Sequence, residues 1–187
     1  MTKTWWLVVG VVVVVGWYFG LTYNRLVGAG VAVDTQWAQV DTVLQRRFDL
    51  IPNVVGAVKG ILNQEQKVFG DLAEARTRYA GATSVGDKVA AANDFQGALG
   101  RLLVVMENYP QLRSVEAVNS LIVELEGSEN RISVERGRYN NLVGNYNLLT
   151  KTFPSAMVAS LFNFQTKQFF QAEVAAKTAP QVDLTNQ

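Results

Sequence analysis

Four charged side chains fall at helical positions that are otherwise apolar, and they are the first candidates for a buried polar site. They are Arg47, Glu65, Glu129 and Arg136. Two guanidinium groups and two carboxylates could pair inside a helical bundle as a polar layer, or could line a binding site. The alternative is that their long stems cover apolar surface while the charged ends reach water, or that paired charges fix the register of the helices. We favour this structural alternative.

A second set of polar residues lies in the segment RYNNLVGNYN, Arg138 to Asn147. Two Tyr-Asn pairs, Tyr139-Asn140 and Tyr146-Asn147, are seven residues apart and therefore share one face of a helix. Their hydroxyl and amide groups both donate and accept hydrogen bonds, so they could recognise a peptide. They could also form hydrogen bonds across a bundle, which is the interpretation that we favour.

The composition excludes many catalytic and metal sites. The 187 residues include no His and no Cys. Nucleophilic triads and dyads that use these residues, zinc sites built from them, haem held by them and iron–sulfur clusters are therefore excluded. A phosphate-binding loop of the G-x-x-x-x-G-K type is also missing from the sequence. Asp and Glu residues could act as acid–base pairs, but no set of them marks a cleft. We expect a protein that is not an enzyme and that binds no cofactor and no metal.

The charge balance argues against nucleic acid as a partner. Lys and Arg number 17, Asp and Glu number 16, and the formal net charge is +1. Domains that bind nucleic acid usually have a strong basic excess.

An uncharged run near the N-terminus predicts a membrane-spanning helix. The 21 residues from Thr4 to Asn24 carry no charge and lie between Lys3 and Arg25. A helix of this length is about 30 Å long, which matches the hydrocarbon core of a bilayer. We therefore expect membrane lipid to be a partner and the protein to be a single-pass membrane protein.

Aromatic residues at both ends of this run support a span that is retained. Trp5 and Trp6 lie at one end and Tyr23 lies at the other, where aromatic rings favour the headgroup level. A cleaved signal peptide would end in a small-x-small site. Here the run continues into the bulky Trp17, and the nearest small cluster is Gly28-Ala29-Gly30. A lipoprotein anchor is excluded because the chain has no cysteine.

The span and the segment after it contain candidates for self-assembly. Gly16 and Gly20 form a G-x-x-x-G pair, which allows two membrane helices to approach closely. The apolar stripe from Val33 to Ile51, which includes Trp37 and Leu44, could lack an apolar cover within the same chain. An uncovered stripe of this size would be unusual on a monomer. We therefore expect a homo-oligomer; the competing account is a monomer whose third bundle helix covers the stripe.

Apolar residues recur at alternating steps of four and three through the first part of the bundle. The positions are Val33, Trp37, Val40, Leu44, Arg47, Ile51, Val54, Val58, Ile61, Glu65, Val68, Leu72, Ala75 and Tyr79. This spacing is typical of a long helix packed in a bundle or coiled coil. Pro52 removes one backbone hydrogen bond, but the pattern continues past it. We therefore expect a single helix over residues 31–80 with a kink at Pro52.

The remaining segments predict three further helices. Gly81–Asp87 reads as a turn, with Ser84 as a helix N-cap. A second helix follows over Asp87–Asn108, a third over Gln111–Lys151 and a short fourth over Pro154–Phe162. The fold class is therefore all-α, with an N-terminal single transmembrane helix followed by an antiparallel helical bundle of three longer helices and a short fourth.

Several segments in sequence resemble the LemA family. They are YNRLV after the apolar run, VDTVLQRRFDLIPNVVGAVKG (Val40–Gly60), ENYPQLRS (Glu107–Ser114), ELEGSENRISVERGRYNNLVGNYN (Glu124–Asn147) and FPSAMVASLFNF (Phe153–Phe164). The resemblance covers most of the chain. It implies an N-terminal single-pass membrane helix and an antiparallel helical-bundle domain, mostly in bacteria. It supplies no catalytic residues.

These observations define the expected organisation. Residues 1–24 form the membrane anchor, residues 25–163 a LemA-like bundle and residues 164–187 a C-terminal tail. We expect a self-assembling scaffold or structural protein at the cell membrane. The alternative is an adaptor or sensor that presents its bundle to another protein, such as a membrane protease or an envelope-stress component. The positive charge of the α-amino group and Lys3, against Arg25 alone after the span, favours a cytoplasmic N-terminus and a bundle outside.

Overall fold

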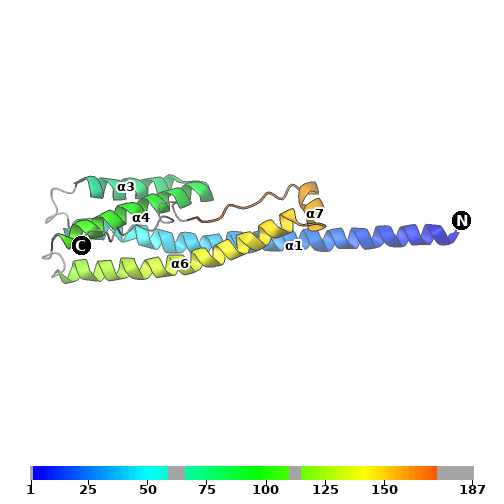
Figure 1. Ribbon diagram of the computed structural model, residues 1–187, viewed down its shortest axis with the longest axis horizontal. Coiled ribbons are helices and arrows are strands. Elements are labelled where there is room, and N and C mark those ends of the chain that lie inside the picture. Colours follow the sequence, from blue (N-terminus) through cyan, green and yellow to red (C-terminus); the bar gives the residue numbers. More distant parts are fainter. Residues whose placement is uncertain (1, 59–65, 110–114, 172–187) are drawn as a thin grey trace, which may run out of the picture. The chain divides into compact units, whose positions relative to one another are not determined.

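The computed structural model describes residues 2–58, 66–109 and 115–171, and in these ranges the chain is helical with no strand (Figure 1). The helices are α1 (Thr2–Asp49), α2 (Ile51–Val58), α3 (Gln66–Gly81), α4 (Val85–Glu107), α6 (Glu116–Lys151) and α7 (Ser155–Leu161). The expected all-α class, with a long apolar N-terminal helix followed by a helical bundle, is confirmed.

The chain divides into two compact units. The first unit combines residues 1–43 with residues 129–169, and the second combines residues 44–128 with the residues from 170 onward. The helices α1 and α6 contribute to both units, because the boundaries fall within them.

In the first unit, α1 and α6 run in opposite directions. The Gln36 amide donates to a carboxylate oxygen of Glu135 across 2.6 Å, and the rings of Trp37 and Tyr139 lie 5.3 Å apart. Nearer the N-terminus, Gly30 approaches Tyr146 so closely that a Cβ there would lie 3.5 Å from the ring. The apolar face between the helices is buried, as its spacing predicts. Its buried residues include Val33, Val40, Tyr139, Val143 and Tyr146.

The second unit contains an α3–α4 hairpin packed on aromatic rings. The Phe48 ring lies 4.4 Å from the Tyr79 ring and 4.6 Å from the Phe95 ring, measured between centroids. Ser84 caps α4, since its Oγ accepts a hydrogen bond of 3.0 Å from the Asp87 backbone N–H. This cap confirms the prediction of Ser84 as the N-cap. The helix α4 begins at Val85, two residues before the predicted start, and ends within a residue of the predicted boundary.

The prediction of one kinked helix over residues 31–80 is wrong. Pro52 has no N–H for the Phe48 carbonyl, so α1 ends at Asp49 and α2 begins at Ile51. The chain then reverses before α3. Tyr79 lies 31 positions after Phe48, so a straight helix would separate the two rings by about 46 Å, yet they are in contact. The apolar spacing correctly indicated which residues are buried but did not report the reversal.

The later helices agree with the sequence. The helix α6 ends at Lys151 as predicted, while the predicted start at residues 111–114 lies outside the described residues. The short fourth helix is α7, which begins directly after Pro154.

Candidate functional site

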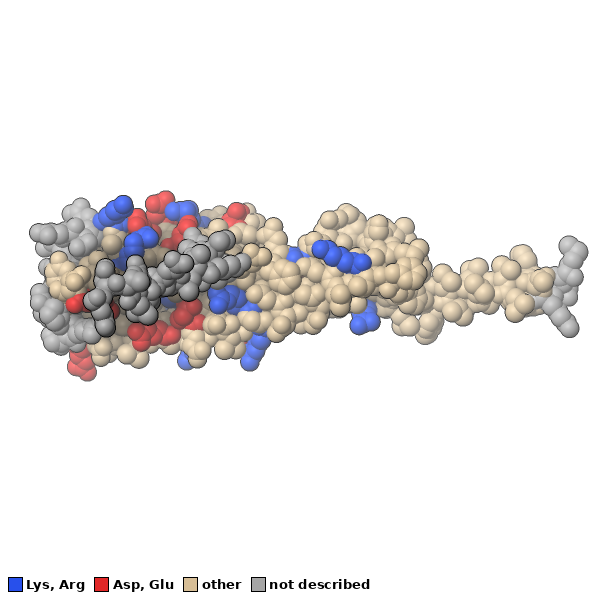
Figure 2. Space-filling model, viewed as in Figure 1, with Lys and Arg blue, Asp and Glu red and all other residues tan. Residues whose placement is uncertain are grey.

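The N-terminal part of α1 is long and apolar enough to cross a membrane. Its most apolar window of 18 residues has a mean hydropathy of 1.9, and none of that window is buried inside the chain. Trp5, Trp6 and Trp17 are all highly exposed. On the face drawn in Figure 2, this part of α1 carries no charged side chain.

Gly16 and Gly20 leave an open surface on this helix. A Cβ atom added at either glycine would meet nothing within 4 Å. The surface is therefore accessible to a second helix, and assembly through it stays a prediction.

The stripe from Val33 to Ile51, by contrast, is covered within the chain. Val33, Val40 and Leu44 are buried, and the Trp37 ring packs on Tyr139. The premise that this stripe lacks an apolar cover is therefore wrong, because residues of the same chain supply it.

The end of the predicted span is built into the first unit. Leu26, Val158 and Ala159 form a fully buried cluster, against which Phe19, Leu149 and Phe164 pack. We call these six residues the junction cluster. In Figure 1, α7 lies beside α1 at this level.

Tyr23 joins the same region. Its ring lies 4.8 Å from Phe162 and 5.7 Å from Phe164 in edge-on arrangements. Tyr23, which was predicted to lie at the end of the span, therefore packs on aromatic rings of the first unit.

The charged residues on the apolar stripes are divided between the two units. Arg47, in the second unit, is only 5% exposed; it donates a 2.7 Å hydrogen bond to Gln96 and lies over the Phe95 ring at 5.4 Å. Glu129 and Arg136 are half-buried and belong to the first unit, and Glu65 lies outside the described residues. A polar layer formed by the four together stays a prediction.

The Tyr-Asn face of α6 holds an extended segment of the same chain. The Asn147 amide donates to the Lys167 carbonyl and accepts from the Lys167 N–H, each across 2.8 Å. The Tyr139 hydroxyl donates to the Gln168 carbonyl across 2.9 Å. These side chains therefore bind a peptide backbone, and that backbone is the chain's own segment after α7.

Charge strengthens this contact. The Lys167 ammonium pairs with Asp34 of α1 at 2.5 Å and lies 5.9 Å from the centre of the Tyr146 ring. Burial, and secondarily the Asp34 charge, raises the pKa of Tyr139. Burial also raises the pKa of Tyr146. The positive charge of Lys167 lowers this pKa, and the negative charge of Asp34 raises it further. Both hydroxyls therefore stay protonated near neutral pH.

The extended conformation of residues 163–171 could not be predicted from the sequence, because this segment has no helical or strand spacing. The helix α7 ends at Leu161, and Asn163, two residues later, has a φ of 56°. Asn tolerates this left-handed region better than most residues. The signals available were the aromatic residues Phe164, Phe169 and Phe170, of which Phe170 is buried.

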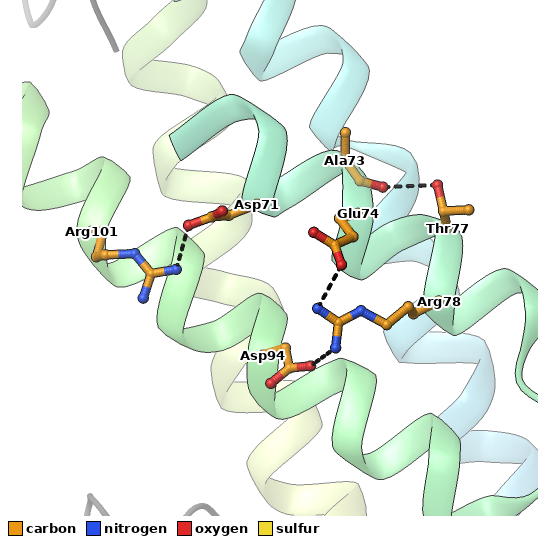
Figure 3. Close-up of polar contacts among 7 residues, drawn as sticks. All are labelled: Asp71, Ala73, Glu74, Thr77, Arg78, Asp94 and Arg101. Atoms are coloured by element: carbon orange, nitrogen blue, oxygen red, sulfur yellow. Dashed lines mark hydrogen bonds and ion pairs between the residues drawn. The ribbon is translucent and has the colours of Figure 1, made fainter. Parts of the chain in front are cut away.

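Exposed ion pairs join α3 and α4 in the second unit (Figure 3). Arg101 pairs with Asp71 at 2.9 Å, and Arg78 bridges Asp94 at 2.6 Å and Glu74 at 3.1 Å. Such pairs contribute about 0–1 kcal/mol each at a surface. Their residues line a small polar hollow of about 230 Å³.

A larger open hollow of about 620 Å³ lies in the same unit, near Phe48 and Tyr79. Its charged residues are of both signs, since Asp49 pairs with Arg76 at 3.9 Å and Lys88 lies over the Tyr79 ring. Within the described ranges, no group of three or more acidic side chains gathers to hold a metal ion.

Comparison with known proteins gives matches over most of the chain. A sequence model of the LemA family matches residues 36–184. The chain is also similar to magnetosome proteins MamQ 1 and MamQ 2 of Paramagnetospirillum magneticum, each 25% identical over 184 residues, covering 84% of this chain and 68% of the relative. MamQ of Magnetospirillum gryphiswaldense is 23% identical with the same coverage. Because the family match spans far more than half of its 187 residues, the chain belongs to the LemA family.

Proposed function

We propose that this protein is a non-enzymatic, single-pass membrane protein that serves as a helical scaffold at the cell membrane. The observation that carries the proposal is the apolar first part of α1, which is exposed along its length and continues without a break into a packed helical unit. A helix with this surface is stable in lipid, where its backbone groups are satisfied internally. The relatives named magnetosome proteins supply a precedent for a role in a cellular structure.

Anchoring is tested by extraction. The full-length protein should stay in the membrane fraction after alkaline carbonate treatment, because the span is held by lipid and not by surface charge. A protein that washes off with carbonate would contradict the anchor.

Orientation is tested separately. The cationic N-terminal flank favours an N-terminus in the cytoplasm and helical units outside. Protease added to spheroplasts should then digest the helical units. Units that stay intact until the membrane is opened would reverse this orientation.

The scaffold proposal includes self-assembly through the span. Support comes from the open surface at Gly16 and Gly20, where two helices could approach closely. In mild detergent, the Gly16→Leu/Gly20→Leu variant should have a lower mass than the parent, while Gly10→Leu serves as a control on the same helix. The Trp37→Glu/Leu44→Glu variant does not test assembly, because Trp37 packs on Tyr139 in the first unit and Leu44 is buried in the second, so the change should disrupt the chain's own packing.

The second candidate is an adaptor or sensor. It is favoured by the hydrogen bonds from Asn147 and Tyr139 to an extended backbone, which are of the kind that hold a peptide from another protein. A monomer in detergent that co-purifies with one fixed protein would support the adaptor, whereas a defined oligomer supports the scaffold.

A further inference from the structure

The helix α7 and the residues that flank it present an apolar face to solvent. Phe153 is 82% exposed, Met157 57%, Leu161 68% and Phe162 51%. Met157 and Leu161 are four residues apart, so they share one side of α7, while Phe153 and Phe162 flank the helix at its two ends. We call these four residues the α7 apolar face. The opposite side of α7 carries Val158 and Ala159 of the junction cluster.

The contacts of α7 with α1 fix its depth relative to the span. The α1 residues that it meets are Phe19, Tyr23 and Leu26. These residues cover about 10 Å of helix and straddle Asn24, the last uncharged residue of the span. The interfacial layer of a bilayer, between the hydrocarbon core and water, is about 5–8 Å thick on each side. The α7 apolar face is therefore held at the level of this layer whenever α1 crosses a membrane.

The charges around α7 suit the same position. Residues 152–166 carry no charge, and this run lies between Lys151 and Lys167. From Tyr139 to Thr166 the chain contains no Asp or Glu. Lys167 pairs with Asp34 of α1, so the exposed Lys151 is the cation of this run that anionic headgroups can attract. Short amphipathic segments bury their apolar side at the boundary between headgroups and acyl chains.

We propose that the α7 apolar face is a second membrane contact, which lies in the interfacial layer of the bilayer that α1 spans. This inference rests on the proposed span, because continuity with the span selects lipid as the occupant of the face. The contact orients the first unit on the membrane, since a span alone leaves rotation and tilt free.

The test uses spin labels at single cysteines in the full-length protein, which has no native cysteine. Met157→Cys and Leu161→Cys report the α7 apolar face; both side chains are exposed, so neither change removes a buried contact. The protein is reconstituted in vesicles of phosphatidylcholine and phosphatidylglycerol. Collisions of each label are measured with oxygen, which concentrates in lipid, and with a nickel chelate, which stays in water.

Two reference positions frame the result. Val12→Cys, at a side chain 63% exposed, reports the middle of the span. Val134→Cys, at a side chain 45% exposed in α6, is the matched apolar control. Its neighbour Glu135 is hydrogen-bonded to Gln36, which lies about 18 Å along α1 beyond Asn24, so this control is in water.

The proposal predicts an oxygen-to-nickel accessibility ratio at Met157→Cys and Leu161→Cys that is several-fold above that of Val134→Cys and below that of Val12→Cys. Ratios equal to that of Val134→Cys overturn the membrane contact while a high ratio at Val12→Cys keeps the span. Labels shielded from both reagents, with broadening that disappears on dilution with unlabelled protein, assign the face to a second copy instead and also overturn it. A water-like ratio at Val12→Cys rejects the span itself.

Discussion

A single amide side chain makes two of the hydrogen bonds that hold the segment after α7. Asn147 uses both its donor and its acceptor on the two backbone groups of Lys167, which resembles the pairing of adjacent strands. The side-chain chemistry of the Tyr-Asn pairs predicted that they form hydrogen bonds. It did not decide whether their partner is a peptide or another part of the bundle. Residue type could not decide this, because the partner is a segment 20 residues away that has no periodic pattern. Arg47 is a similar case. Its position on the apolar stripe predicts that it is buried, but the sequence does not indicate that Gln96 is its hydrogen-bond partner.

At this scale we predict that Asn147→Ala releases the extended segment. Two hydrogen bonds to Lys167 are lost, which should lower the free energy of unfolding by about 1–3 kcal/mol. Thermal unfolding followed by far-UV circular dichroism measures the change, and trypsin should cleave faster after Lys167. Asn145→Ala, at an exposed position of the same helix, is the control and should match the parent. Unchanged cleavage in Asn147→Ala would contradict the role of this amide.

Tyr139→Phe should lower the free energy of unfolding by about 1 kcal/mol at neutral pH, because the hydrogen bond to the Gln168 carbonyl is lost. The same change should reduce the sensitivity of the protein to alkali. The pKa of Tyr139 is raised in the folded state, so above about pH 10 the unfolded chain releases a proton that the folded chain retains. Stability therefore falls as pH rises through the folded pKa.

The control for this prediction is the parent protein over the same pH range. Its loss of stability above about pH 10 should be steeper than that of Tyr139→Phe, while Tyr146, whose pKa is also raised, contributes equally to both proteins. Parallel curves would show that the Tyr139 hydroxyl has the same pKa in both states.

At the scale of helices, apolar spacing predicted which faces are buried and failed where the chain turns back. Leu72, Ala75 and Tyr79 are buried as the spacing requires, although they lie on a separate helix, α3. Two helices that each bury one face can show the same alternating spacing of four and three apolar positions as one continuous helix. The spacing therefore does not reveal whether the chain reverses between them. The Ser84 cap, which depends only on local chemistry, was predicted correctly.

The core face of α6 can be tested with a matched pair of substitutions. Leu125 is 2% exposed and Val123, two residues earlier, is 60% exposed. Leu125→Asp should lower the free energy of unfolding by about 3–5 kcal/mol, because it places a carboxylate in an apolar interior. Val123→Asp should change it by about 0.5 kcal/mol or less. Equal melting temperatures for the two variants would mean that this face of α6 is assigned incorrectly.

At the scale of the whole chain, the sequence predicted an anchor joined to a bundle but not that the two share a core. Leu26 lies just beyond the uncharged run, and it is fully buried against α7. This contact could not be foreseen, because Leu26 and Val158 are far apart in sequence and neither belongs to the heptad stripes. The end of the anchor is thus also part of the first unit.

A truncated protein that starts at Val31 should therefore remain helical but lose the order of α7. The junction cluster would lack Phe19 and Leu26, so Val158 and Ala159 would face water. Limited chymotrypsin digestion in mild detergent should cleave at Phe153 and Phe162 faster than in a protein that starts at Trp17, which keeps both α1 residues. Equal protection would show that α7 is held without α1.

The first unit consists of two stretches of chain that are synthesised at different times, which affects how it folds. Residues 44–128 are translated between its two halves, which takes on the order of ten seconds at roughly 5–20 residues per second. During this interval α1 has already left the ribosome. Leu26 and Trp37 are still without their packing partners Val158 and Tyr139, which have not been synthesised. Most of the second unit is the contiguous stretch of residues 44–128, which can fold first, before the residues from 170 onward are made. The nascent chain must therefore keep an apolar face of α1 from aggregating until the ribosome has nearly finished, and a chaperone or the membrane surface would have to cover it in the meantime.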